Sequence, residues 1–349
     1  MKRTNYLVLG MLLTFLFSSN LYSANYKFTN DAEIDDFYDA QTTAISVDTL
    51  EITGSVTQVK VNSLIDVISS VESAFIAQNL TEPTGDGQVG VSTLEAVLSE
   101  IAMNGSIIIT DCPFLTWIGG DRDGVYVGMP LHIKGDLYLK NTHIPFPYVD
   151  GWHPYTSFGG IQQVDGNLFL ETSFELQKGG KWFNELQRVG GDFIIHFYGS
   201  PSTWEFYIPN LTYVGGNIEY RAPADGLINE SAIAFWGLES LRGLTYIGGG
   251  VKILNFPNLQ WGESGDWGET GLCWVRQLID DEVIDYACND VVLGFEDEPI
   301  DLATHAACPD GKNPAANPRP LPEKDPNCYP SGVQALQSDL PAIARIIDN

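Results

Sequence analysis

The sequence contains few positive charges. Its 349 residues include 18 Lys and Arg against 45 Asp and Glu, so the formal net charge is −27 at pH 7. A surface of this sign repels polyphosphate and lacks a basic footprint, and we therefore expect no nucleic-acid partner. The composition is also 44% hydrophobic, which supplies ample apolar material for a large core and excludes a disordered chain.

Recognised catalytic and metal-binding motifs are missing. The chain has five histidines and contains no H-E-x-x-H, no G-x-S-x-G and no Walker loop. Asp121-Arg-Asp123-Gly and Gly85-Asp86-Gly resemble pieces of calcium loops, but the later acidic ligand of an EF-hand is absent, which favours ordinary acidic turns. We predict no catalytic residues, no metal and no cofactor.

Cysteine is scarce until the last quarter of the chain. Cys273, Cys288, Cys308 and Cys328 form an even set with spacings of 15, 20 and 20. These spacings lack the close ligand pairs of a zinc site. In an oxidising compartment they predict two disulfides, with all three pairings left open. Cys112 is left over, and a buried free thiol is favoured there over a reactive one.

Long apolar runs are missing apart from one near the start. Met1-Lys2-Arg3 is basic, residues 6–17 are apolar, and residues 18–24 are small and polar, which is the order of a secretory signal peptide. The run is too short for an ordinary membrane span, so removal of residues 1–24 is favoured over an uncleaved anchor. We expect an exported protein, located outside the cell, on its surface or in the periplasm of a bacterium.

Internal repeats dominate the rest of the sequence. Five segments share Leu or Ile, then Val or Ile, then Gly, and each is followed by apolar residues at alternate positions. The glycines fall at positions 105, 135, 166, 191, 216 and 249, with spacings of 30, 31, 25, 25 and 33. This period suits one β-strand and one Gly-containing corner per repeat. The pattern predicts a mainly β fold, a right-handed parallel β-solenoid, over a sandwich with chance Gly-Gly turns.

The alternation predicts which side chains stack inside the solenoid. The first inward residue of successive coils forms one predicted interior column of Leu137, Leu168, Phe193, Ile218 and Val251. Residues 50–52 fit an earlier strand of the same kind. Each coil then buries its apolar side only against its neighbours.

A second repeated phrase marks the corner after the strand. Residues 109–115 and 253–259 share an apolar residue, Asp or Asn, Pro and Leu at equal spacing. An Asp or Asn after a strand can bond the backbone of the turn and stack between coils. The repeat resembles that of bacterial secreted proteins similar to the receptor L domain, a leucine-rich-repeat-like β-helix that serves as a ligand-binding module, and the resemblance covers residues 46–262.

The ends of the solenoid need caps. Residues 25–45 predict an N-terminal cap in which Asn30 and Glu33 form a capping box, and Ile34, Phe37 and Tyr38 form the apolar side of a short helix. Residues 263–309 predict a cysteine-bearing helical cap whose apolar side is Trp274, Leu278 and Ile284. Residues 310–349 form a Pro-rich tail with a last short helix from about residue 340.

The same alternation predicts an apolar stripe on the outside of the sheet. Its candidate ligand- or partner-binding residues are Ile108, Tyr138, Phe169 and Ile194. A soluble monomer rarely leaves such a stripe in water. Three alternatives follow. The chain covers the stripe with a corner insertion, the Pro-rich segment or the terminal helix; a homodimer buries it; or it is an open ligand face. Aromatic residues of the corner insertions are further candidates, namely Trp152, Tyr155, Trp182 and Trp204.

These features favour a binding or recognition protein over an enzyme. Flat stacked sheets with aromatic loops suit extended ligands, so glycan binding or host adhesion at the cell surface is the first expectation. A protein–protein interaction module that does not bind glycans is the alternative. A carbohydrate-active β-helix enzyme is less favoured, because the outward strand positions show no cluster of charged residues of the kind such sites use.

Overall fold

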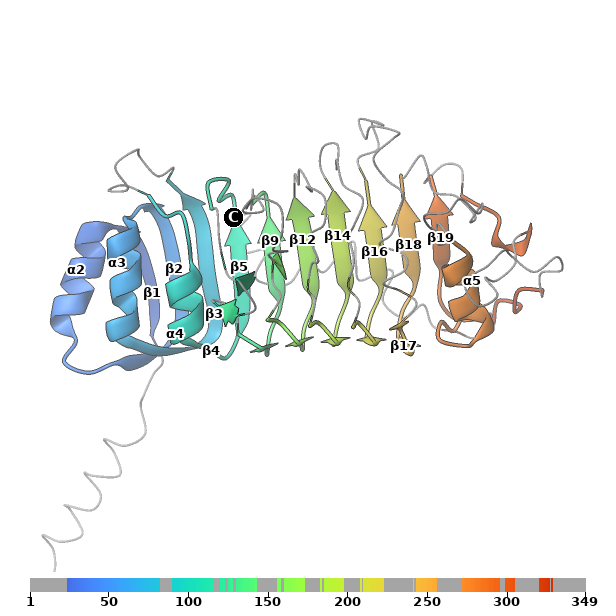
Figure 1. The fold of residues 1–349 in the computed structure, drawn as a ribbon, viewed down its shortest axis with the longest axis horizontal. Helices are drawn as coiled ribbons and strands as arrows, with labels where there is room; N and C mark the ends of the chain where they lie inside the picture. Colours follow the sequence, from blue (N-terminus) through green and yellow to red (C-terminus); the bar gives the residue numbers. More distant parts are fainter. Residues whose placement is uncertain are drawn as a thin grey trace, which may run out of the picture.

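The structure is a computed structural model in which parallel strands follow one another along a single long axis (Figure 1). It describes residues 24–81, 90–142, 156–172, 183–197, 208–222, 241–255, 272–295, 299–304 and 320–328, apart from residues 116, 117, 119, 123, 124, 128, 129, 158, 159, 184, 209, 242 and 327. The predicted signal peptide, residues 1–24, lies outside this part of the chain except for its last residue.

The main sheet contains eleven of the described strands, ten of which follow one another in chain order with every pair parallel. The strands are β1 (Asn25–Asn30), β2 (Ile45–Ser55), β3 (Ile68–Leu80), β5 (Ser106–Thr110), β9 (Leu137–Lys140), β12 (Leu168–Thr172), β14 (Phe193–Phe197), β16 (Ile218–Arg221), β18 (Val251–Leu254) and β19 (Val291–Gly294). A short strand, β4 (Ala102–Met103), also pairs with β3. The sheet thus extends beyond residues 46–262 at both ends.

A shorter parallel sheet lies along the corner that precedes each long strand. Its strands are β8 (His132–Ile133), β11 (Gln163–Val164), β13 (Arg188–Val189), β15 (Tyr213–Val214) and β17 (Tyr246–Ile247). Short and long strands alternate along the chain, and each pairs only with its equivalent in the next repeat. This is the arrangement of a parallel β-solenoid and confirms the predicted fold class. A small antiparallel sheet joins β6 (Gly120–Arg122), β7 (Val125–Val127) and β10 (Thr156–Ser157).

The predicted interior column is confirmed. Leu137, Leu168, Phe193, Ile218 and Val251 are direct partners in successive strands, and all five are fully buried. The column continues to Ile107 on one side and to Val291 on the other. A second column runs parallel to it two residues later, through Leu139, Leu170, Ile195, Tyr220 and Ile253. Side chains of neighbouring coils therefore form one continuous core.

A ladder of polar side chains stacks the corners before the long strands. Asp136, Asn167, Asp192 and Asn217 each accept a hydrogen bond from a backbone N–H of the following coil, at 2.6, 2.8, 2.7 and 2.8 Å. The hydroxyl of Ser106 begins this ladder by accepting from the N–H of Asp136. Buried corner N–H groups need such partners, which explains the Asp or Asn that follows the glycines at positions 135, 166, 191 and 216.

The repeat glycines are required by close packing between coils. A methyl group on Gly191, Gly216 or Gly249 would overlap the polar ladder of the preceding coil and approach its backbone to 3.1, 2.9 or 2.8 Å. None of the three has a positive φ, since the described glycines with positive φ are Gly54, Gly90 and Gly294. The prediction attributed these glycines to a tight corner, but the structure shows that they make room for the neighbouring coil.

The corner after the strand behaves as predicted. Asp111 and Asn255, which share the repeated phrase, both adopt the left-handed conformation, with φ of 51° and 67°. Asn141 occupies the equivalent corner with φ of 47°, and its side-chain amide donates to Asp111 at 2.8 Å. Asp and Asn tolerate this conformation better than other side chains do. The amide of Asn255 donates to the carbonyl of Ala222 at 3.1 Å.

Helices cover the two ends of the solenoid. At the N-terminal end lie α2 (Asp31–Ala40), α3 (Gln58–Ser63) and α4 (Glu95–Glu100), with a 3-10 turn at Leu64–Asp66. Asn30 caps α2 by accepting from the N–H of Glu33, as the predicted capping box requires. In return the Glu33 carboxylate accepts from the side-chain amide of Asn30 and from the N–H of Thr29, one residue before the cap. Ile34 and Phe37 are buried, whereas Tyr38 is 38% exposed. Its inclusion in the apolar side was wrong, because one residue separates Tyr38 from Phe37 by about 100° around a helix.

At the other end α5 (Leu272–Asp280) buries Leu278 beside the last coils, and a 3-10 turn follows at Leu302–Thr304. The side chain of Trp274 lies outside the described residues. Ile284 is buried but does not belong to the helix, because it forms a parallel bridge with Ile247 and so continues the shorter sheet. The part of the chain that the structure describes contains no helix long and apolar enough to cross a membrane.

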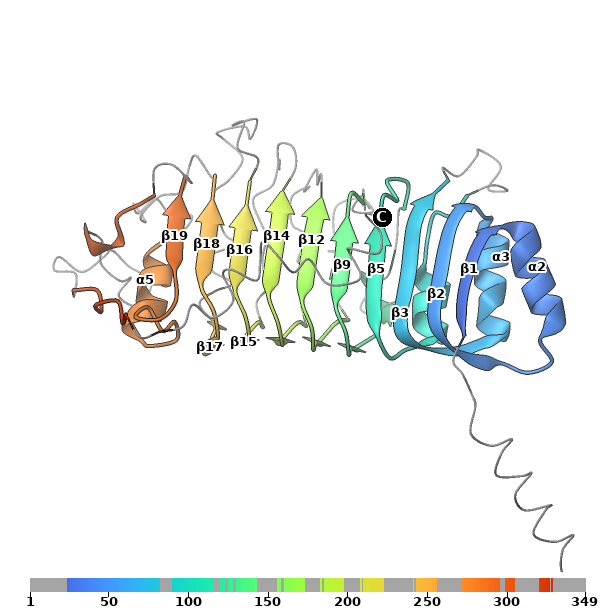
Figure 2. The same cartoon turned by 180° about the vertical axis from the view of Figure 1, so that it is seen from behind.

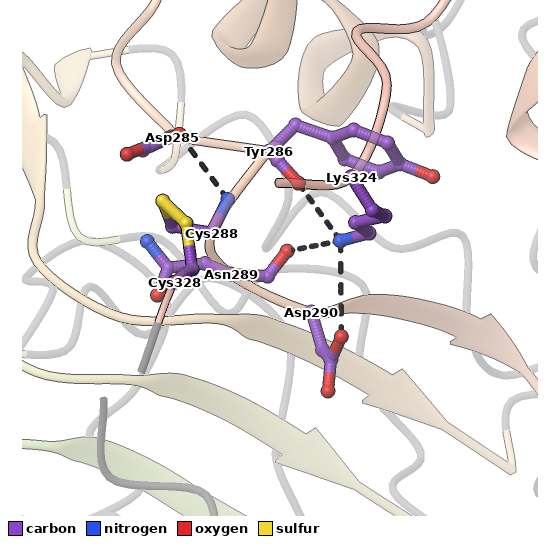
Figure 3. The surroundings of a disulfide bond; sticks show 7 residues. All are labelled: Asp285, Tyr286, Cys288, Asn289, Asp290, Lys324 and Cys328. Carbon is purple, nitrogen blue, oxygen red and sulfur yellow. Dashed lines mark hydrogen bonds and ion pairs between the residues drawn. A yellow bond between two sulfur atoms is a disulfide. The ribbon is translucent and has the colours of Figure 1, made fainter. Parts of the chain in front are cut away.

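One of the two predicted disulfides is present. Cys288 is bonded to Cys328, which ties residues 320–328 to the last coil (Figure 3). Next to it the ammonium of Lys324 donates to the carbonyls of Tyr286 and Asn289 at 2.8 and 2.6 Å. The side chain of Cys273 and the whole of Cys308 lie outside the described residues. Cys112 is a buried free thiol, as predicted, and burial raises its pKa to about 12.

Candidate functional site

The outward stripe of the main sheet forms a continuous ladder. Ile108, Tyr138, Phe169 and Ile194 are direct partners on β5, β9, β12 and β14. The rings of Tyr138 and Phe169 stack with their centroids 4.6 Å apart, one coil spacing. We call these four residues the outer ladder. The structure brings them together in the order that the alternation predicts.

The outer ladder is not open to solvent. Ile108, Tyr138 and Ile194 are only 3%, 8% and 9% exposed, and Phe169 is half-buried. The outer ladder is therefore mostly removed from solvent within a single chain.

A charged cluster closes the C-terminal end of the outer ladder. Glu219 follows Ile194 in register and accepts from the ring of His196 at 3.0 Å and from Arg221 at 2.8 Å. Burial of Glu219 raises its pKa, but the hydrogen bonds and charges of His196 and Arg221 outweigh burial and lower the pKa to about 2. The carboxylate is therefore ionised and fully paired, which is the arrangement of a structural ion cluster rather than of a general acid.

The aromatic candidates of the corner insertions are not placed. Trp152, Tyr155, Trp182 and Trp204 all lie outside the described residues. Their assignment to a binding surface stays a prediction.

A second row of side chains, on the outside of the shorter sheet, was not predicted from the sequence. One residue of each short strand forms it, in direct register, namely His132, Gln163, Arg188, Tyr213 and Tyr246. We call it the short-sheet row. The neighbouring residues Ile133, Val164, Val189, Val214 and Ile247 point into the core and are buried. The two-residue strands therefore divide cleanly into an inner column and an outer row.

The C-terminal half of the short-sheet row is aromatic, with Tyr213 half-buried and Tyr246 exposed. Tyr213 and Tyr246 stack with centroids 4.8 Å apart and an angle of 14° between the rings. The guanidinium of Arg188 lies over the other face of Tyr213, 3.6 Å from the ring centroid. Tyr246 is 47% exposed. Behind the rings stand Gly215 and Gly248, where any side chain would contact the tyrosine ring at 3.4 Å.

The N-terminal half of the row is polar. The ring of His132 lies 2.8 Å from the carboxylate of Asp165, which also accepts from Gln163. Burial of Asp165 raises its pKa slightly, but the hydrogen bonds from Gln163 and His132 outweigh burial and leave the pKa below its usual value. Lys134 donates to the amide oxygen of Asn104 at 2.8 Å and extends this polar network toward the N-terminal end.

The repeat itself carried the signal for this row. The residue before the buried Val or Ile of each repeat is the outward one, and Leu-Thr-Tyr recurs at 211–213 and 244–246. The predicted alternation covers only the strand after each glycine, so the two residues before it were expected to form a corner. Among the described residues, no three His, Cys, Asp or Glu side chains lie close enough together to hold a metal ion.

Comparisons with protein-family models, with curated proteins and with solved structures find no match to this chain. The resemblance to the receptor L domain therefore stays a prediction, and arguments about function depend on the geometry of the two outward rows.

Proposed function

We propose that this protein is an exported recognition protein that binds a glycan along the short-sheet row. The observation that carries the proposal is the stack of Arg188, Tyr213 and Tyr246, which lies beside polar groups on a repeating surface. Arg188 and Tyr213 are half-buried, and Tyr246 is exposed. The predicted signal peptide supports an extracellular, cell-surface or periplasmic location. The outer ladder is less suited to the same role, because its side chains are mostly buried.

A carbohydrate suits this surface for chemical reasons. A sugar ring presents an apolar face of C–H groups and an edge of hydroxyl groups. Exposed tyrosines offer an apolar ring together with a hydroxyl, while Gln163 and Arg188 supply hydrogen-bond donors. The row repeats once per coil, about 4.8 Å, so an extended chain can contact several coils at once. The proposal assigns binding to these residues and no bond-making step.

A protein ligand is the second candidate function. Tyrosine and arginine are enriched at protein–protein interfaces, and the row combines Arg188 with two tyrosines beside a polar network. A protein partner would need a larger area than one row, so this function also involves the corner loops.

The test measures binding of the purified protein to soluble polysaccharides by affinity electrophoresis and calorimetry. The panel consists of laminarin, xylan, mannan and chondroitin sulfate. The double variant Tyr213→Ala/Tyr246→Ala should lose at least about tenfold in affinity, equivalent to about 1.4 kcal/mol. The matched control is Tyr38→Ala, which removes an exposed tyrosine from α2. Equal affinity of the double variant and the control would refute the assigned site, and binding of a protein partner but of no glycan would favour the second candidate.

A further inference from the structure

Three side chains in the aromatic half of the short-sheet row carry hydrogen-bond donors that the described residues do not use. Arg188 is half-buried with its guanidinium over the ring of Tyr213, yet its side chain forms no ion pair and no hydrogen bond with any described residue. The hydroxyls of Tyr213 and Tyr246 also have no hydrogen-bond partner in this part of the chain. A charged group that is partly removed from water is stabilised when it gains a hydrogen-bonded partner. These donors are therefore available to an external acceptor.

The polar half of the row differs, because its side chains bond to one another. The ring of His132 lies 2.8 Å from the carboxylate of Asp165. Lys134 donates to the amide oxygen of Asn104, and the same amide donates to Glu72 at 3.2 Å. Each of these charged groups thus has a polar neighbour within the protein. The unused donors are concentrated in the aromatic half.

The stack turns ring edges, rather than ring faces, toward a ligand at Tyr213. The strands β15 and β17 lie side by side where the long strands begin (Figure 2). Tyr213 lies in register between Arg188 and Tyr246, so the guanidinium at 3.6 Å and the second ring at 4.8 Å occupy its two faces. The edge of an aromatic ring is the positive part of its quadrupole, and a planar guanidinium carries its N–H groups at its own edge. A group that approaches from solvent therefore meets positive charge and donors.

We propose that this part of the row binds the acidic group of an anionic polysaccharide, a carboxylate or a sulfate ester, with Arg188 as the main contact and Tyr213 and Tyr246 beside it. The inference rests on the proposed function, because it names the class of glycan for the same site. The fork of a guanidinium matches two oxygens of a carboxylate or sulfate, and such charge-assisted pairs are stronger than hydrogen bonds between neutral groups. The tyrosine hydroxyls can donate to neighbouring oxygens of the sugar.

The charge of Arg188 is available to such a ligand, because no carboxylate of the described residues pairs with it. Asp165 lies one strand away, but it pairs with His132 and not with Arg188. Five other cations of the described chain each pair with a carboxylate, namely Lys27, Lys60, Arg221, Arg276 and Lys324.

The acidic surface of the whole protein limits the kind of polymer. A formal charge of −27 repels densely charged chains. Among its described residues, the short-sheet row has one cation without a polar partner, Arg188, so it suits one acidic group at a time. A polysaccharide in which acidic and neutral sugars alternate meets both conditions.

The test compares three derivatives of one polysaccharide by calorimetry with the full chain. Desulfated chondroitin keeps only the carboxylate, carboxyl-reduced chondroitin sulfate keeps only the sulfate, and chondroitin treated in both ways keeps neither. At least one acidic derivative should bind at least about tenfold more tightly than the neutral one, and the one that does so identifies the acidic group. Arg188→Gln should remove this preference. The matched control Lys252→Gln, which removes a positive charge from β18 in the main sheet, should preserve it.

Urea unfolding verifies that each variant is folded. If Arg188→Gln does not fold, the salt dependence of the parent decides. Raising NaCl from about 0.1 to about 1 M shortens the screening length from about 10 to about 3 Å. This change should weaken binding of the preferred acidic derivative at least about threefold, and an affinity that does not depend on salt refutes the inference.

The failure of this inference is distinguishable from the failure of the proposed function. Equal affinity for the acidic and neutral derivatives overturns the acidic class; if Tyr213→Ala/Tyr246→Ala weakens that binding, the proposed glycan site still stands. An acidic preference that Arg188→Gln leaves unchanged also overturns the inference, because the recognised charge then lies elsewhere on the protein. Lack of binding to all three derivatives overturns it too, and laminarin, xylan and mannan then decide the proposed function.

Discussion

Replacing Gly216 by alanine separates two explanations of the repeat glycines. If glycine only eased a tight corner, alanine would be tolerated, since Gly216 does not have a positive φ. Alanine would then stabilise the protein by about 0.4–1 kcal/mol through the unfolded state. If coils stack as the structure shows, alanine must destabilise it. The added methyl would lie 2.9 Å from the carbonyl carbon of Gly191 and 3.0 Å from the nitrogen of Asp192, and would overlap the Asp192 carboxylate.

The expected size follows from those contacts. Forcing a methyl group into a packed position costs about 1–3 kcal/mol. The Asp192 carboxylate also accepts from the backbone and side chain of Asn217 at 2.7 and 2.9 Å, and a hydrogen bond to a charged group contributes about 1.5–3 kcal/mol. With part of the strain relieved by movement of the coil, we expect a total loss of about 2–4 kcal/mol.

The assay is urea unfolding followed by far-UV circular dichroism, with Thr245→Ala as the control. Thr245 is exposed on the next repeat, and its replacement should change the free energy of unfolding by no more than about 0.5–1 kcal/mol. An unchanged or increased stability of Gly216→Ala would show that neighbouring coils do not approach as closely as described, and the stacking argument would fail.

Three further predictions concern the core, the ion cluster and the thiols. Leu168→Ala should lower the free energy of unfolding by about 2–5 kcal/mol, because it opens a cavity between two filled coils; a loss below about 1 kcal/mol in urea unfolding would contradict the interior column. The carboxyl of Glu219 has a pKa of about 2 in the folded protein, against an ordinary value of 4.5. Its ionised form therefore contributes roughly 3 kcal/mol to the free energy of unfolding above pH 4.5, and this contribution is lost as the pH falls toward 2. The difference in the free energy of unfolding between the parent and Glu219→Gln should narrow over that range, and a constant difference would refute the assignment. Mass spectrometry without reduction should find Cys288 joined to Cys328. After treatment of the folded protein with a thiol-reactive maleimide at pH 8, Cys112 should be unmodified, and its modification would contradict its burial.

The sequence predicted the long strands because their periodicity is strong. Inward residues such as Leu168 and Ile218 recur in every coil, and a one-residue slip would move all of them to the wrong side. The shorter sheet was missed because two residues per strand carry no measurable alternation. Only comparison across repeats, for example of Tyr213 with Tyr246, reveals that the outward position is shared.

The burial of the outer ladder could not be derived from periodicity. Alternation shows which way Tyr138 and Ile194 point, but not how far their side chains are removed from solvent. The boundary of the last helix was also wrong. Ile284 follows Leu278 by six residues, about 240° around a helix, so the two do not share one helix face. Pairing with Ile247 places Ile284 in the shorter sheet.

Chemical modification of exposed tyrosines tests the proposed function most directly. The full chain is treated with tetranitromethane, with and without the polysaccharide that binds most tightly in the panel, and the modified residues are identified by mass spectrometry. The account predicts that the glycan slows nitration of Tyr246, which is 47% exposed, while Tyr38 on α2, 38% exposed, reacts at the same rate in both samples. A glycan that binds the protein but leaves the nitration rate of Tyr246 unchanged would contradict recognition along the short-sheet row.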